Sequence, residues 1–247
     1  MSSGIWAAAS GAVGQIAHLD NASNNLANLD TAGFHVDRMV FRRALTDVTG
    51  KQSSHPSLEY SVVQSATPDM RAGRIVPTGR ELDVALPDDN AFFAVQTEHG
   101  VRYTKAGNTQ IMPDGALATP DGMPYLGPNG RPLVVPMGTS QVSIAPSGEL
   151  QVDGELDGQR MMVVSFPNTA GLEKAGSVLF HATPAAGLPQ RVADPYMQTQ
   201  ALEKSTDRAF AHMRDVVNAT RNFSMVSQVI EAFKAVEDRA ARDIVGK

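Results

Sequence analysis

Apolar and small side chains recur at alternating steps of four and three along the start of the chain. This spacing lines one side of an α-helix and is typical of a coiled-coil seam. Thr31 and Gly33 follow the last seam position, and glycine readily takes the left-handed conformation that ends a helix. We therefore expect a helix within residues 1–33. Its predicted seam is Ile5, Ala9, Ala12, Ile16, Leu19, Ser23 and Leu26.

The same rhythm returns near the carboxyl terminus, with Glu237 as the one polar member of the seam. Ser205 or Thr206 provides a cap at its start, and the pattern runs almost to Gly246. At about 1.5 Å per residue this helix would be on the order of 55 Å long. A helix of that length must project or find partners. Its seam is Val216, Ala219, Phe223, Val226, Ile230, Phe233, Ala240 and Ile244.

The middle of the chain alternates short β-rich runs with turn signals. Four runs predict strands, at residues 92–95, 101–104, 133–135 and 161–164. Between them stand Pro-Asp-Gly or Pro-Asn-Gly turns, in which proline fixes the first turn angle and glycine takes the positive one. The predicted fold is therefore α+β, a central all-β domain with long terminal helices that pair as a coiled coil. The predicted boundaries are 1–33 for the first helix, 34–80 for an extended connection, 81–187 for the β domain, 188–204 for a return connection and 205–247 for the second helix.

Three glycines weaken the first helix. Gly4, Gly11 and Gly14 each cost about 1 kcal/mol relative to alanine in a helix interior. Glycine also allows a second backbone to approach closely, so the sequence favours packing over stability in isolation. The heptad pattern does not say whether the partner is the other end of this chain or a neighbouring copy.

Composition excludes several classes of function. The 247 residues carry a net charge of -5 with scattered Lys and Arg, so nucleic acid is not an expected partner. The chain has no cysteine, which excludes disulfides, thiolate metal sites and a cysteine nucleophile. No Lys or Arg precedes Arg38, so the positive segment of a cleaved secretory signal is missing and we expect no such signal.

Catalytic and ligand-binding motifs are also missing. The six histidines lack the spacing of a zinc peptidase, and no phosphate-binding loop or serine-hydrolase elbow occurs. The acidic run from Asp153 to Gly158 lacks the ligand spacing of a calcium loop and is better interpreted as a hairpin turn. We expect no enzyme activity, no metal, no cofactor and no small-molecule substrate.

Three amides gather near the end of the first helix. Asn24, Asn25 and Asn28 could fix the register between subunits through hydrogen bonds to neighbouring backbone, or could simply cap a polar helix end. The residues alone leave these two interpretations level.

One segment is more specific than its period. Residues 23–34, SNNLANLDTAGF, closely resemble the amino-terminal signature of bacterial flagellar rod and hook proteins, and the preceding helix resembles the one that leads into it. The resemblance continues through residues 74–86, 92–108 and 113–127 and resumes in the carboxyl-terminal helix. Within the family, the length and the sequence of the chain are most similar to those of the proximal rod proteins, with the distal rod proteins as the near alternative.

This resemblance implies a structural subunit of the flagellar basal-body rod. Members form an axial helical tube across the periplasm, with paired terminal helices inside and the β domain outside. The implied partners are further copies of the chain, other proximal and distal rod proteins, and the flagellar type III export apparatus. A head-to-tail contact that does not close produces a filament, which suits such a tube.

Two other functions remain as hypotheses. The chain could be an envelope interaction module that binds through the β domain while its helices form a closed local bundle. A cell-wall enzyme with a site assembled from distant residues is the third hypothesis, because missing motifs alone do not exclude such a site.

Overall fold

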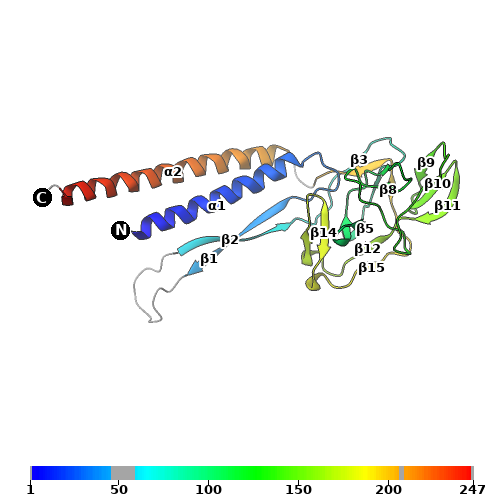
Figure 1. The fold of residues 1–247 in the computed structure, drawn as a ribbon, viewed down its shortest axis with the longest axis horizontal. Coiled ribbons are helices and arrows are strands. Elements are labelled where there is room, and N and C mark those ends of the chain that lie inside the picture. The colour runs from blue at the N-terminus through cyan, green and yellow to red at the C-terminus, as the bar shows by residue number, and fades with distance from the viewer. Residues whose placement is uncertain (1, 46–58, 206–208, 246–247) are drawn as a thin grey trace. The chain divides into compact units, whose positions relative to one another are not determined.

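The computed structural model describes residues 2–45, 59–205 and 209–245 (Figure 1). Its chain divides into two compact units. Unit 1 contains Met1–Ala27, Asp37–Thr67 and Ala209–Lys247, and unit 2 contains Asn28–Val36 and Pro68–Arg208.

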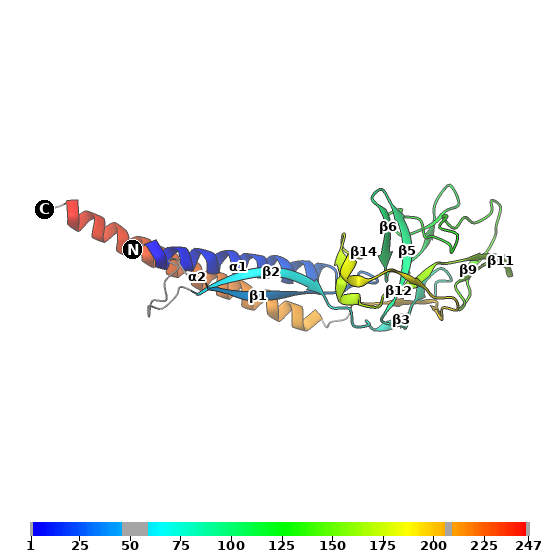
Figure 2. The same cartoon turned by 90° about the horizontal axis from the view of Figure 1, so that it is seen from below.

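Unit 1 is built on two long helices. Helix α1 spans Ser2–Ala27 and helix α2 spans Ala209–Val245; they lie side by side and run antiparallel (Figures 1 and 2). Strands β1 (Asp37–Leu45) and β2 (Glu59–Pro68) form a two-stranded sheet, and β1 contacts α1. The predicted pairing of the terminal helices is confirmed, and it occurs within one chain. None of the described helices is long and apolar enough to cross a membrane.

Helix ends follow the local sequence closely. After α1, the Thr31 amide donates to the Asn28 carbonyl at 3.1 Å and Gly33 takes a positive φ of 68°, as predicted for a left-handed stop. At the other end, α2 runs to Val245, the residue before the predicted limit. Ser205 lies in coil ahead of α2, and Thr206 falls outside the described residues.

A six-stranded antiparallel sheet forms the centre of unit 2. Its order is β13-β14-β6-β5-β12-β15. Because successive side chains of a strand point to opposite faces, Phe92 and Phe93 of β5 enter separate cores, one with Phe166 and Phe180 and one with Tyr125. The strands are β5 (Ala91–Thr97), β6 (Gly100–Thr104), β12 (Val163–Ser165), β13 (Leu172–Lys174), β14 (Leu179–Ala182) and β15 (Gln190–Arg191).

Smaller sheets and turns complete unit 2. Strands β9 (Val142–Ile144), β10 (Glu149–Val152) and β11 (Glu155–Arg160) form a three-stranded meander. Three two-stranded pairs join β3 (Ile75–Pro77) to β17 (Ala201–Glu203), β4 (Val84–Ala85) to β16 (Gln198–Thr199), and β7 (Gln110–Ile111) to β8 (Leu117–Ala118). Two short 3-10 turns are η1 (Thr169–Gly171) and η2 (Pro184–Ala186).

Most of the predicted β-structure is present. Predicted strands 92–95 and 101–104 lie within β5 and β6, and β12 covers the second half of 161–164. The predicted strand 133–135 is wrong, because only an isolated bridge joins Val134 to Ala116. Pro132 and Pro136 flank it, and proline has no N–H to extend a ladder.

The predicted turns are confirmed. Gly115, Gly122 and Gly130 all have positive φ, at 85°, 81° and 73°. In the acidic run, Asp153 and Gly154 form the turn between β10 and β11, both with positive φ, and residues 155–158 are part of β11.

Candidate assembly surface

The predicted seam of α2 is the least exposed side of that helix. Ala219 is completely buried, and Val216, Phe223, Val226 and Ile230 are half-buried. Phe233, the next seam position, is already 41% exposed. This inner side holds α2 within unit 1, where α1 is its main contact.

The buried side of α1 is shifted from the predicted seam. Gly14, Ala22 and Asn25 are buried, whereas Ile16 and Ser23 are exposed. The buried positions therefore lie about one residue toward the amino terminus from the predicted ones. This offset rotates the buried side of α1 by about 100° around the helix axis. Of the other predicted positions, Ala9, Ala12, Leu19, Leu26 and Asn28 are half-buried and Asn24 is exposed, and the side chains of Ile5, Ala240 and Ile244 lie outside the described residues.

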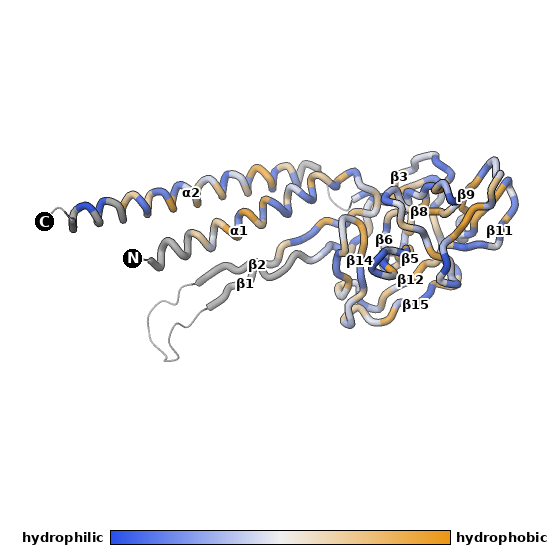
Figure 3. The backbone as a smooth tube through the Cα atoms, viewed as in Figure 1, coloured by the Kyte–Doolittle hydropathy of each residue, from blue (hydrophilic) through white to orange (hydrophobic). Residues whose placement is uncertain are grey.

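A second apolar stripe runs along α2, about 100° around the helix from the predicted seam. It consists of Met225, Val229, Ala232 and Val236, at steps of four, three and four, and all four are exposed. Met225, Val229 and Val236 are 56%, 47% and 64% exposed. We call these four residues the outer stripe; the hydropathy of both helices is drawn in Figure 3. The alternating steps of four and three are visible in the sequence, but they were not recognised as a second stripe because the predicted seam of α2 has the same spacing.

Helix α1 also presents apolar side chains to solvent. Val13 is 66% exposed and Ile16 is 45% exposed. A Cβ added at Gly11 or Gly14 would meet nothing within 4 Å. The close backbone approach that these glycines predicted is therefore not made within the described chain.

The amides at the end of α1 have different surroundings. The Asn25 side chain donates to the Asp37 carbonyl and accepts from the Asp37 amide, both at 3.0 Å, so it joins α1 to the start of β1. Asn28 accepts a hydrogen bond from the Thr31 hydroxyl at 3.3 Å, which is a local cap. Asn25 and Asn28 therefore serve their own chain, and a role in register between subunits stays a prediction.

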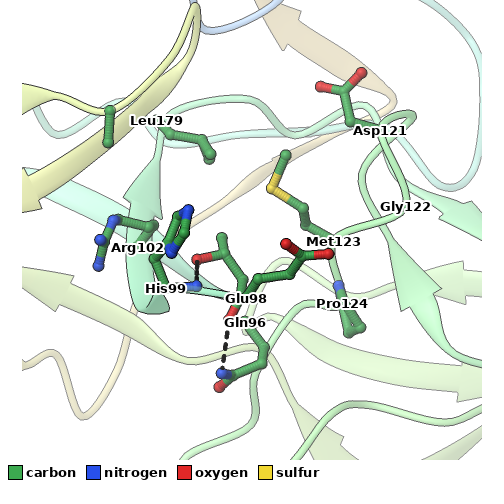
Figure 4. A pocket seen from close by; sticks show the side chains of 11 residues that line it. Gln96, Glu98, His99, Arg102, Asp121, Gly122, Met123, Pro124 and Leu179 are labelled. Atoms are coloured by element: carbon green, nitrogen blue, oxygen red, sulfur yellow. Dashed lines mark hydrogen bonds between the residues drawn. The ribbon is translucent and has the colours of Figure 1, made fainter.

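An open cavity of about 560 Å³ lies beside the turn between β5 and β6 (Figure 4). Met123 and Leu179 supply apolar lining, and Glu98, His99 and Arg102 supply charged groups. The hydrogen bonds drawn there belong to the turn: the Gln96 side chain donates to the Thr97 carbonyl, and the His99 amide donates to the Thr97 hydroxyl. The cavity therefore has no hydrogen-bonded nucleophile and base among its described lining residues. Within the described ranges, no group of acidic or histidine side chains is arranged to hold a metal ion.

These features define a class of protein. An antiparallel helix pair that leaves an apolar stripe uncovered is typical of a structural subunit that packs against other proteins.

Comparisons with known proteins identify the family. Residues 88–152 match the flagellar hook protein FlgE/F/G D1 domain. The chain is 33% identical to the flagellar basal-body rod protein FlgF of Escherichia coli over 234 residues, covering 89% of this chain and 88% of that protein. It is 30% identical to FlgF of Salmonella typhimurium, covering 88% of each chain, and 28% identical to FlgG of Bacillus subtilis, covering 86% and 88%.

The chain belongs to the flagellar basal-body rod protein family. It is a structural, non-enzymatic subunit of the flagellar basal-body rod and assembles with rod proteins. The resemblance found in residues 23–34 is thereby confirmed at the level of the family. The comparisons do not separate FlgF from FlgG, since FlgF relatives at 33% and 24% identity bracket a FlgG relative at 28%.

Proposed function

We propose that the outer stripe of α2, together with exposed Val13 and Ile16 of α1, packs against neighbouring rod subunits in an axial helical tube. The supporting observation is the outer stripe itself. Its large members are about half exposed although the inner side of α2 already has a partner. Contiguous exposed apolar side chains mark interaction surfaces in soluble proteins.

The predicted inner seam has a different role in this proposal. Ala219, Phe223 and Ile230 stabilise the helix pair within one subunit, and the pair as a whole then contacts its neighbours. With the inner seam used inside the subunit and the outer stripe used between subunits, each subunit would present a preformed helical hairpin with an apolar outer surface. The closed-bundle hypothesis accounts for the inner seam only and leaves the outer stripe without a role.

Further parts of the function rest on family resemblance. We propose that the rod built from this subunit spans the periplasm and transmits torque, that neighbouring partners include proximal and distal rod proteins, and that the flagellar type III apparatus exports the chain without a cleaved signal. The length and the sequence of the chain support a proximal role better than a distal one.

A single charge in the outer stripe tests the proposal. We expect Val229→Asp to abolish swimming, because a buried unpaired carboxylate in the assembled rod costs several kcal/mol. The same charge should change the free energy of unfolding of the monomer by less than about 0.5 kcal/mol, since Val229 is exposed there.

The matched control is Ser224→Asp, which adds the same charge at an exposed polar position of the same helix. Swimming assays and counts of basal bodies by electron microscopy compare the two variants. Equal motility of the two strains would refute the outer stripe as a contact surface.

A further inference from the structure

Three ionisable side chains are buried together inside unit 2. His35, Lys105 and Glu203 are 1%, 0% and 2% exposed. They come from different segments: His35 from residues 28–36, which we call the strap, Lys105 from the residue directly after β6, and Glu203 from the end of β17. Burying an ionisable group costs folding free energy unless the group is paired, so the charge states of these three side chains depend on one another.

Glu203 contacts each of the other segments. Its Oε1 accepts a hydrogen bond from the Gly73 amide at 2.7 Å and lies 3.8 Å from His35 Nε2. Its Oε2 lies 3.9 Å from Lys105 Nζ, and no described donor reaches this oxygen at hydrogen-bond distance. The backbone carbonyl of Glu203 accepts from the Gly33 amide of the strap at 2.9 Å. Glu203 therefore holds the strap on unit 2 through its backbone carbonyl, while its side chain accepts from Gly73 and faces His35 and Lys105.

The partners of His35 determine which nitrogen carries its proton. His35 Nδ1 lies 2.8 Å from the Asp69 carbonyl, which only accepts, so Nδ1 is the donor of the neutral ring. Nε2 then faces Glu203 without a proton. The ring also packs edge-on against Phe180, with centroids 5.8 Å apart. With His35 neutral, the buried carboxylate of Glu203 is balanced by one ammonium group, that of Lys105.

Protonation of His35 would place a second positive charge in this dry site. Burial lowers the pKa of His35; the Asp69 carbonyl and Glu203 act in the opposite direction, and Lys105 and Lys174 lower the pKa further. Burial also lowers the pKa of Lys105, opposed by Glu203, Asp89 and Asp88. The site thus resists additional positive charge from either group.

We propose that the cluster of His35, Lys105 and Glu203 is a pH-sensitive lock that holds the strap on unit 2 while His35 is neutral and releases it when His35 is protonated. The strap directly follows α1, and Glu203 lies six residues ahead of α2. The lock therefore joins the two segments through which unit 2 is connected to the terminal helices. It belongs to unit 2 alone and does not depend on the proposed assembly surface.

The sign of the pH effect follows from linkage. The unfolded chain takes up the His35 proton near pH 6.5, and the folded chain takes it up at lower pH. Docking of the strap is therefore fully stabilised above about pH 6.5 and weakens as the pH falls from there toward the folded pKa of His35.

Hydrogen exchange by mass spectrometry on the full chain measures this directly. We expect the protection factor of residues 28–36, corrected for intrinsic exchange rates, to fall several-fold between pH 7.5 and pH 5.5, because the released strap binds the His35 proton more readily than the docked strap. His35→Asn keeps a donor for the Asp69 carbonyl but does not titrate, so its protection should not change with pH. His99→Asn, at an exposed histidine of the same unit, should keep the wild-type decrease.

Lys105→Met provides an independent test. Without the ammonium group, the Glu203 carboxylate has no cation, so protonation within the cluster becomes favourable. The strap of this variant should be better protected at pH 5.5 than at pH 7.5, the reverse of the wild type. Constant protection in the wild type, or an unchanged decrease in His35→Asn, would overturn the lock.

Discussion

At the scale of single residues, Gly33 shows how closely two distant segments of the chain approach each other. Gly33 has a φ of 68°, and a Cβ added there would lie 2.2 Å from the Ala106 amide nitrogen. The position requires glycine for its backbone conformation and for close approach of a second backbone. Sequence reasoning identified the first requirement from the end of the helical pattern. It missed the second, because Ala106 is more than 70 residues away in the chain.

Gly33→Ala compared with Gly79→Ala separates these two requirements. Gly79 also has a positive φ, of 76°, but a Cβ there would meet nothing within 4 Å. We expect Gly79→Ala to cost about 1 kcal/mol of unfolding free energy and Gly33→Ala about 3 kcal/mol, because the second adds a clash with backbone to the left-handed strain. Urea denaturation measures both. Equal costs would show that unit 2 yields easily at Ala106.

At the scale of elements, the period of the sequence predicted both helices and their pairing. It did not predict the rotation of α1, whose buried side contains Asn25 rather than Leu26. The reason is chemical, since the Asn25 amide satisfies both backbone groups of Asp37 and thereby fixes which side of α1 faces inward. A pattern of apolar positions does not contain that hydrogen-bond geometry. Strands β1 and β2 lay in a region for which the sequence predicted only mixed extended structure.

The glycines of α1 make a prediction at the same scale. Gly11→Ala and Gly14→Ala should each stabilise the monomer by about 0.5 to 1 kcal/mol, because alanine favours the helix and its Cβ meets no neighbour here. If neighbouring subunits approach α1 closely in the rod, the double variant should swim more slowly despite its greater stability. Urea denaturation and swimming rates measure the two effects. Greater stability with normal swimming would remove close approach as the reason for these glycines.

At the scale of the whole molecule, the surface proposed for assembly is separate from the cores that stabilise the fold. Unit 2 has two cores on the faces of its main sheet, and unit 1 has a helix pair whose inner side is covered and whose outer stripe is not. The sequence predicted the α+β class, the principal turns and the family. It could not show which apolar stripe of α2 is already occupied within the subunit, because both stripes have the same rhythm and only packing distinguishes them.

The most direct test of this account is photo-crosslinking from α2 in intact basal bodies. A photoreactive amino acid is incorporated at position 229 of the outer stripe or, as the control, at position 224. The account predicts adducts with neighbouring rod subunits from position 229 and few from position 224. Absence of adducts from position 229 in strains that swim normally, or equal adducts from both positions, would contradict it.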